Sequence, residues 1–172
     1  MRSMFTKAGA GLAAFVLFAA VAAAAKPNFT GTWVLDPAKS EGLGGPQGGT
    51  PAPETMIVTQ DGDKLAFERT FKSPQGDRVQ KDTYTADGKE GEFTMPARGG
   101  GETKGKRTAK WSADGSVLEV NDKATFDTPN GAMSTEANSK WTLSADGKTL
   151  TVESTRTSQR GEQKSKRVYN KQ

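Results

Sequence analysis

Four Asp-Gly pairs divide this chain into short segments of strand-like composition, and they constrain the fold more than any other feature. The pairs are Asp61-Gly62, Asp87-Gly88, Asp114-Gly115 and Asp146-Gly147, and three of them lie in the near-copies TADGK, SADGS and SADGK. An Asp-Gly pair between extended segments is a strong hairpin signal, because both central residues of such a turn must tolerate a positive φ. The pattern therefore predicts a chain built from consecutive hairpins.

Looser glycine-containing turns alternate with the Asp-Gly pairs, in the sequences SPQGD, MPARGGG, TPNGA and SQRGE. The segments between these turns are rich in Thr, Val, Phe, Tyr and Trp, which are residue types enriched in β-strands. No segment after the first 25 residues has helical periodicity. We expect ten strands, near residues 30–35, 54–60, 63–72, 77–85, 90–95, 103–112, 116–127, 132–144, 148–158 and 162–170.

Ten antiparallel strands joined by short hairpins form an up-and-down meander, and a sheet of this size closes because closure removes exposed strand edges. The predicted fold class is therefore all-β, an antiparallel up-and-down β-barrel of about 8–10 strands, with residues 26–172 as its one domain. Alternate turns of a meander lie at alternate ends, so the four Asp-Gly turns share one end, the tight end. The looser turns and the long loop at residues 37–53 share the other, the loose end, which we expect to be the mouth.

The first 25 residues have the features of a secretory signal peptide. Arg2 and Lys7 precede an apolar segment from Ala8 to Ala25, which ends in small residues suited to cleavage. We expect cleavage after Ala25, a periplasmic or secreted location, and no membrane span in the mature domain. The alternative is an uncleaved membrane anchor, since the apolar segment is nearly long enough to span a bilayer.

Charge and missing residue types exclude several function classes. The chain has 24 Lys and Arg against 20 Asp and Glu, and removal of Arg2 and Lys7 leaves 22 basic residues, a net charge of +2. So small a net charge argues against a nucleic-acid binder, and we interpret the basic run KGKRTAK at residues 104–110 as a solvated strand edge. The chain has no Cys and no His, which removes thiolate nucleophiles and the commonest general base and zinc ligand. We expect no cofactor, no metal and no enzymatic activity, with carboxylate pairs or a Ser–Lys arrangement left open as catalytic groups.

Two segments at the ends of the mature chain resemble known barrel families. FTGTWVL at residues 29–35 resembles the N-terminal signature of the calycin superfamily, which includes the lipocalins and the fatty-acid-binding proteins. RVYNK at residues 167–171 resembles the closing Arg-x-Tyr strand of the fatty-acid-binding proteins. FTGTWVLDPAKS, ADGKTL and the terminal VYNKQ together resemble a group of bacterial exported lipocalin-like proteins. The resemblance implies a lipocalin-like barrel over the mature chain.

The resemblance also implies roles for residues at both ends of the chain. In fatty-acid-binding proteins the closing Arg-x-Tyr holds a ligand carboxylate, which implies this role for Arg167 and Tyr169. The first and last strands of a closed meander are neighbours, so we expect Trp33 to plug the barrel floor with a cation such as Arg167 across its ring. A plain core tryptophan is the alternative. The loop at residues 37–53 departs from the family, because a Gly- and Pro-rich segment cannot form the two lid helices. We expect a flexible loop there instead.

Alternation along the predicted strands indicates which side chains line the interior. Aromatic side chains would bury the apolar part of a ligand, and guanidinium and phenol groups would donate to an anionic head group. The alternatives for the arginines are pairing with Asp82 or Asp122, or extension to the rim. The candidate ligand-binding residues are Phe67, Phe93, Trp111, Phe126, Trp141, Arg69, Arg156, Arg167 and Tyr169.

The sequence thus predicts a monomeric, exported β-barrel protein that carries or senses a small apolar or anionic amphipathic ligand without a covalent bond. A ligand-free structural or interaction module of the cell envelope is the alternative, with a small interior filled by its own side chains. The two differ in cavity volume, because a ligand binder needs a pocket of roughly 300 Å³ or more. We expect that pocket to open at the loose end.

Overall fold

The computed structural model describes residues 26–43, 51–74, 76–96, 102–128, 131–159 and 161–172, so the predicted signal peptide lies outside the described residues. The fold confirms the predicted class and all ten predicted strands, which form one antiparallel sheet in the order β4-β3-β2-β1-β10-β9-β8-β7-β6-β5. The strands are β1 (Gly31–Leu35), β2 (Glu54–Asp61), β3 (Lys64–Phe71), β4 (Arg78–Thr85), β5 (Asp87–Pro96), β6 (Glu102–Trp111), β7 (Val117–Thr128), β8 (Gly131–Leu143), β9 (Thr149–Ser158) and β10 (Gly161–Lys171).

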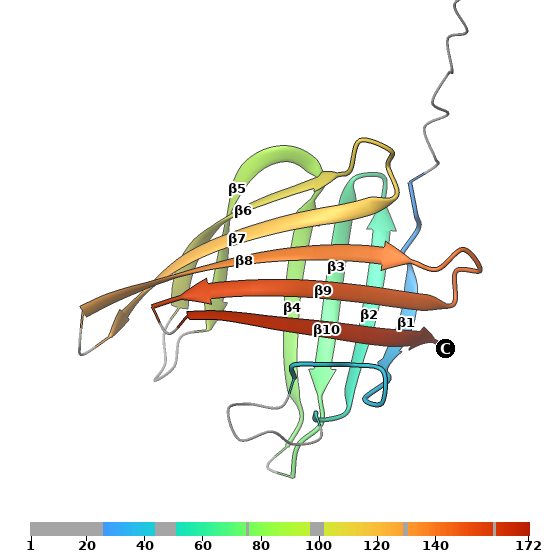
Figure 1. Ribbon diagram of the computed structural model, residues 1–172, viewed down its shortest axis with the longest axis horizontal. Coiled ribbons are helices and arrows are strands. Elements are labelled where there is room, and N and C mark those ends of the chain that lie inside the picture. The colour runs from blue at the N-terminus through green and yellow to red at the C-terminus, as the bar shows by residue number, and fades with distance from the viewer. Residues whose placement is uncertain (1–25, 44–50, 75, 97–101, 129–130, 160) are drawn as a thin grey trace, which may run out of the picture.

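The first and last strands, β1 and β10, lie side by side (Figure 1). Trp33 pairs with Lys171 and Leu35 pairs with Tyr169, which confirms the predicted neighbour relation. The sheet curls about this junction. In Figure 1, β7 to β10 cross the front of the view, and β1 to β4 run across them behind, so the two arms enclose an interior.

β4 and β5 are the two edges of the sheet, although they follow one another in the chain. The hairpin expected at Asp87-Gly88 is therefore wrong. The Ala86 N–H donates to the Asp63 carbonyl at 2.7 Å beside β3, whereas Asp87 pairs with Lys110 of β6. The chain thus crosses from one arm of the sheet to the other between adjacent residues, which leaves no room for a paired hairpin. We call this unpaired boundary between β4 and β5 the seam.

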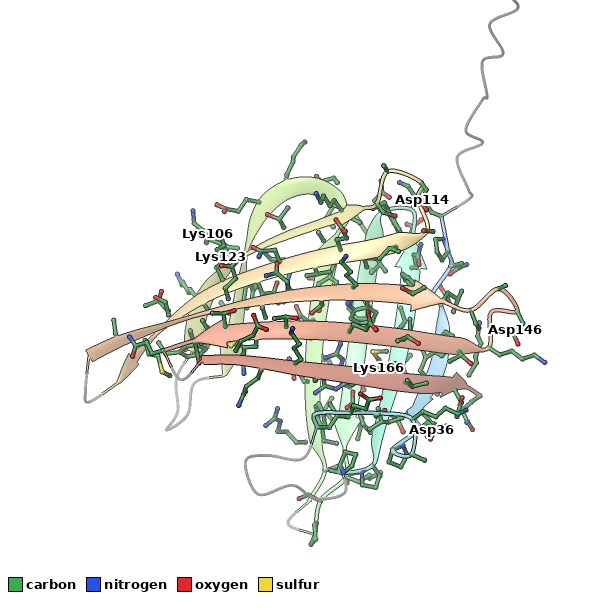
Figure 2. All side chains as sticks on the ribbon, viewed as in Figure 1. Asp36, Lys106, Asp114, Lys123, Asp146 and Lys166 are labelled. Carbon is green, nitrogen blue, oxygen red and sulfur yellow. The ribbon has the colours of Figure 1, made fainter. Side chains whose placement is uncertain are left out.

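The Asp-Gly turns at the tight end use a different backbone geometry from the one expected. Gly115 and Gly147 have φ values of 77° and 69°, but no described residue other than glycine has a positive φ, so Asp114 and Asp146 do not. Each aspartate instead accepts local hydrogen bonds; Asp114 Oδ1 accepts from the Ser112 hydroxyl at 2.6 Å. A side-chain acceptor of this kind shapes the turn without left-handed backbone at the aspartate. Figure 2 shows Asp114 and Asp146 at the tips of hairpins at this end.

A contiguous apolar core fills the tight end of the barrel. Its members alternate along the strands and belong to both arms of the sheet, so closure of β1 onto β10 is what brings them together. An inward alternation of this kind pins the strand register, because a slip of one residue would expose the whole set. The largest fully buried side chains include Trp33, Trp141, Tyr169, Phe29, Met56 and Leu65.

The first part of the long loop after β1 is held against β10. The Asp36 N–H donates to the Val168 carbonyl at 2.8 Å, and Glu41 forms a β-bridge with Lys166. Leu43 packs against the apolar core. The flexible loop expected at residues 37–53 is therefore fixed up to residue 43, and residues 44–50 lie outside the described residues.

Candidate functional site

The inner face of the barrel changes from apolar to polar between the tight end and the loose end. Along β9, the inward-facing side chains change from buried Leu150 and Val152, through half-buried Ser154, to exposed Arg156. The polar groups at this transition form ion pairs across the interior. We call them the polar belt, which consists of Glu54, Arg69, Asp82, Arg107, Asp122 and Arg167.

Glu54 is the centre of one half of the polar belt. Its side chain is only 4% exposed. Its Oε1 accepts a hydrogen bond of 2.6 Å from the Tyr169 hydroxyl. The Nε of Arg69 lies 3.9 Å from Oε1, and the Nε of Arg167 lies 3.6 Å from Oε2. Strands β2, β3 and β10 thus place two guanidinium groups and one phenol around a carboxylate that the protein itself supplies.

Burial fixes the protonation state of Tyr169. The side chain is fully buried, and burial raises the pKa of its hydroxyl well above the ordinary value for tyrosine. The positive charges of Arg69 and Arg167 act in the opposite direction, whereas Glu54 adds to the increase. The hydroxyl therefore keeps its proton and donates it to the Glu54 carboxylate, a charge-assisted hydrogen bond.

Trp141 connects the polar belt to the apolar core. Its ring centroid lies 4.9 Å from that of Phe67, and the guanidinium carbon of Arg69 lies 5.4 Å from its own centroid. The side chain is 1% exposed, and its Nε1 has no hydrogen-bond partner among the described residues. The Nε of Arg167 is also buried and has no hydrogen-bond partner among the described residues. Buried donors in native proteins are nearly always bonded, so these two N–H groups stand out as unsatisfied in the described part of the chain.

Arg107 is the centre of the other half of the polar belt. It is 7% exposed and donates to both oxygens of Asp122, at 2.6 and 2.8 Å. It also donates to both oxygens of Asp82, with Nη2 3.0 Å from Oδ2, and to the Thr83 carbonyl at 3.2 Å. The sequence offered Asp82 and Asp122 as possible partners of the candidate ligand-binding arginines. Both instead pair with Arg107, which was not a candidate. This arginine links β6 to β7 and, across the seam, to β4.

Two aromatic rings enclose the Arg107 guanidinium. Its central carbon lies 4.2 Å from the centroid of Tyr84 on β4 and 4.3 Å from that of Phe93 on β5. Phe93 pairs with Gly105 of β6, where an added Cβ would lie 2.5 Å from the Phe93 ring. Glycine at this position therefore allows the ring to lie flat over β6 and reach the arginine.

Six of the predicted ligand-binding residues belong to these two clusters. Arg69, Arg167 and Tyr169 surround Glu54, Phe67 and Trp141 lie against one another beneath Arg69, and Phe93 covers Arg107. A continuous set of contacts joins the two clusters, since Phe67 also lies 4.5 Å from Tyr84.

The other three predicted ligand-binding residues lie elsewhere. Trp111 lies at the tight end, where its ring stacks on Phe29 at 5.8 Å and its Nε1 donates to Asp63 at 3.0 Å. Phe126 is half-buried on the inner face of β7 near the loose end. Arg156 is exposed and lies in register with Asp122, two strands away across β8. The structure therefore does not include these three in the polar belt.

Trp33 is fully buried beside the closing strand, and its Nε1 donates to the Phe29 carbonyl at 2.8 Å. The cation over its ring is Lys171, with Nζ 5.2 Å from the ring centroid, and not Arg167 as expected. The strand register explains the difference, because Lys171 pairs directly with Trp33, whereas Arg167 pairs with Val152 on β9.

Sequence reasoning missed Glu54 and Arg107. Arg107 lies in the basic run at residues 104–110, and alternation turns it inward while Lys106 faces solvent. Its neighbours two residues away on the same face, Gly105 and Ala109, are small and buried, and they leave room for a guanidinium. A charged residue between two small inward-facing residues was the available signal. Glu54 begins a strand whose next two inward-facing residues, Met56 and Val58, are apolar.

A groove of about 1030 Å³ runs along the seam. Its walls include the inward-facing Asp82, Phe93 and Arg107 and the outward-facing Ile57 and Glu68. It lies on the tight-end half of β2, β3 and β4, and not at the loose end where an opening was expected. A second groove, of about 530 Å³, crosses β6 to β9 and has Lys106 and Lys123 in its wall, which lie close together in Figure 2.

The described ranges hold neither a candidate metal site nor a helix that could span a membrane. Within them, no group of three or more acidic side chains is arranged to hold a metal ion. In the same ranges, no helix has the length and apolar character needed to cross a membrane.

Two solved structures share the β-barrel fold of this chain. Zebrafish ileal bile acid-binding protein, in complex with cholic acid, matches with a TM-score of 0.52 and 20% sequence identity, over 84% of this chain and 98% of that chain. Secretory abundant heat soluble protein 4 from Ramazzottius varieornatus matches with a TM-score of 0.51 and 16% identity, over 84% of this chain and 94% of that chain. Likeness at these identities shows a shared fold. No protein-family model matches the sequence, and no curated protein matches it.

Proposed function

We propose that this protein binds a small amphipathic ligand, without a covalent bond, in the loose-end half of its barrel. The observation that carries the proposal is the pair of buried donors beside the polar belt, Trp141 Nε1 and Arg167 Nε, which have no hydrogen-bond acceptor among the described residues. Acceptor oxygens on the head group of a ligand would supply the partner that each of them lacks.

The apolar part of the ligand would lie between the polar belt and the loose end. The inner face there carries apolar side chains that are half-buried, whereas those of the tight-end core are fully buried. Half-burial of inward-facing side chains supports an interior that is open to solvent at this end. These side chains are Phe71, Phe93, Met95, Phe126 and Met133.

The comparisons agree with this proposal at the level of the fold. A barrel of the same type holds cholic acid, a molecule with a large apolar part and a polar head. The architecture therefore suits a ligand of this class, and the head-group contacts proposed for this chain come from its own residues, Arg69, Arg167, Tyr169 and Trp141.

A titration with two matched tryptophan variants tests the proposal. We expect saturable displacement of the uncharged dye Nile red by amphipathic molecules with a twelve-carbon chain, on the order of one per barrel. Trp141→Phe keeps an aromatic ring but removes the indole N–H, so it should weaken binding about five- to tenfold, the equivalent of one hydrogen bond. Trp111→Phe, which removes an indole N–H that already donates to Asp63, should leave binding unchanged. Absence of saturable displacement, or equal losses in both variants, would contradict the proposal.

A ligand-free structural module is the second candidate, and one observation favours it. The carboxylates of Glu54, Asp82 and Asp122 all have partners within the protein, so much of the interior is satisfied by its own groups. Asp82 and Asp122 also share one arginine, which leaves neither poised as a free acid or base and favours a non-enzymatic role. Native mass spectrometry of protein purified from its own envelope would separate the two candidates, because only a carrier retains a bound small molecule.

The proposal includes export and a monomeric state. Residues 1–25 would direct export and be removed after Ala25, to leave a periplasmic or secreted domain that begins at Lys26. N-terminal sequencing of the purified protein tests the cleavage site, and light scattering after size-exclusion chromatography tests the monomer. A retained N-terminus would support the membrane-anchor alternative.

A further inference from the structure

We infer that Glu54 is a built-in occupant of the head-group site, and that the ligand accordingly carries an uncharged, hydrogen-bond-accepting head such as an amide or alcohol instead of a carboxylate. This inference rests on the proposed function, since it names the chemical class that the proposed site selects. It replaces the anionic head group that the closing Arg-x-Tyr strand suggested.

Glu54 already occupies the donors that a ligand carboxylate would need. Tyr169 already donates to Glu54 Oε1 at 2.6 Å, and the nearest guanidinium nitrogens of Arg69 and Arg167 lie 3.9 and 3.6 Å from Glu54 oxygens. Glu54 is 4% exposed, so it is held in the interior and does not extend to solvent. A second carboxylate would share these donors with Glu54, and like charges in close proximity oppose each other's ionisation.

The positive and negative charges of the polar belt balance one another. The belt holds three guanidinium groups and three carboxylates, so it already has no net formal charge. An anionic head group would therefore add an uncompensated charge to a buried set of ion pairs, which is strongly unfavourable. An uncharged oxygen adds none.

Two donors beside the polar belt have no hydrogen-bond partner among the described residues. Trp141 Nε1 is a neutral donor in a side chain that is 1% exposed, and Arg167 Nε has its charge partly offset by Glu54. Each is a donor that the oxygen of an amide or alcohol would satisfy while Glu54 stays in place. The belt would thus attract an uncharged head and repel a charged one, and such a combination of attractive and repulsive contacts confers selectivity.

A pair of ligands that differ only in the head group tests the inference. Dodecanamide and dodecanoate have the same chain, and at about neutral pH only the second carries a charge. We expect the wild-type protein to bind dodecanamide at least about tenfold more tightly, measured by displacement of Nile red. Glu54→Gln removes the resident charge but keeps the side-chain shape, so we expect the preference to reverse in favour of dodecanoate. Glu68→Gln makes the same change of charge on the outer face of β3 and should keep the wild-type preference.

Each outcome bears on either the inference or the proposed function. Wild-type protein that binds dodecanoate as tightly as dodecanamide overturns the inference and leaves the proposed function intact. A folded Glu54→Gln variant that keeps the wild-type preference also overturns the inference, because another group then sets the selectivity. Failure of both ligands to bind wild-type protein overturns the proposed function.

A double variant keeps the test decisive where Glu54→Gln alone fails to fold. In Glu54→Gln, Arg69 and Arg167 lose the carboxylate that they share, and a buried charge without its partner is strongly destabilising. Glu54→Gln combined with Arg69→Met removes one charge of each sign and still frees Arg167 and Tyr169. We expect a smaller shift in the same direction, towards dodecanoate. No shift in this folded double variant overturns the inference.

Discussion

The hydroxyl of Tyr169 donates a hydrogen bond of 2.6 Å to Oε1 of Glu54, although β1 lies between their two strands in the sheet. The bond is level with Leu35, which is the last residue of the five-residue strand β1 and pairs with Tyr169. A side-chain contact thus continues the barrel wall on its inner side where strand pairing ends.

Loss of this hydroxyl should destabilise the fold. Tyr169→Phe leaves the buried Glu54 carboxylate with one donor fewer, and we expect the free energy of unfolding to fall by about 1.5–3 kcal/mol, as for other hydrogen bonds to charged groups. Urea denaturation followed by far-UV circular dichroism measures the change. Tyr84→Phe is the matched control, because Tyr84 stacks on Phe67 and Arg107 through its ring. A loss as large in the control would show that the Glu54 contact is not responsible.

Removal of the Arg107 guanidinium should open the seam. In Arg107→Met, Asp82 and Asp122 lose a shared partner while remaining partly buried, and we expect a loss of about 3–5 kcal/mol. Hydrogen exchange should accelerate first in β4 and β5, the two edges of the sheet. Arg78→Met is the control, since Arg78 is an exposed residue of β4 that lies over Phe71. Uniform acceleration over all ten strands would argue against a local role at the seam.

A single added methyl group distinguishes two glycines near Phe93. In Gly105→Ala the new Cβ would lie 2.5 Å from the Phe93 ring and 2.6 Å from the Lys123 carbonyl, so the ring must move off Arg107. We expect a loss of about 1–3 kcal/mol, typical of overpacking, measured by thermal or urea unfolding. Gly91→Ala is the control on the paired strand, where an added Cβ meets no atom within 4 Å. Equal effects of the two substitutions would mean that backbone flexibility, and not the ring contact, decides the outcome.

The tight-end turns should make stability depend on pH in the acid range. Hydrogen bonds from Ser112 and Ser116 lower the pKa of Asp114 to about 2, and bonds from Ser144 and Lys148 lower that of Asp146. The folded state therefore binds fewer protons than the unfolded state, whose aspartates titrate near pH 3.8. Their contribution is complete above about pH 4 and is lost as the pH falls towards about 2.

The melting temperature should decrease as the pH is lowered through this range. Asp114→Asn should remove part of that dependence. Ser112→Ala supplies the direct test of the cause, since loss of the main donor should raise the pKa of Asp114 in an NMR titration. An unchanged Asp114 pKa in this variant would assign the shift to another group.

Local patterns in the sequence were sufficient for the strands and for the junction of β1 with β10. The spacing of Asp-Gly turns and alternating faces depends on neighbours in the chain, and closure of a meander makes its ends adjacent by topology alone. The seam was not predictable in this way. It depends on Ala86 bonding beside β3 while the next residue pairs on β6, which is a choice between two arms of a curved sheet.

Alternation also gives the face of a residue but not its partner across the barrel. Arg69 and Arg167 were correctly considered as inward-facing, yet the sequence contains no signal that Glu54, the first residue of β2, would meet them. The misassigned cation at Trp33 has the same origin, because the register of β10 against β1 decides between Lys171 and Arg167.

The seam has a consequence for how the molecule behaves at high concentration. Unpaired strand edges can pair with other chains and seed aggregation, and β4 presents such an edge. At Thr83 both backbone groups on this edge are already bonded, the N–H to Asp82 at 2.9 Å and the carbonyl to Arg107 at 3.2 Å. The ion pair that bridges the seam thus also blocks the middle of the edge against a neighbouring chain, and its loss would favour fibrillar self-association over simple unfolding.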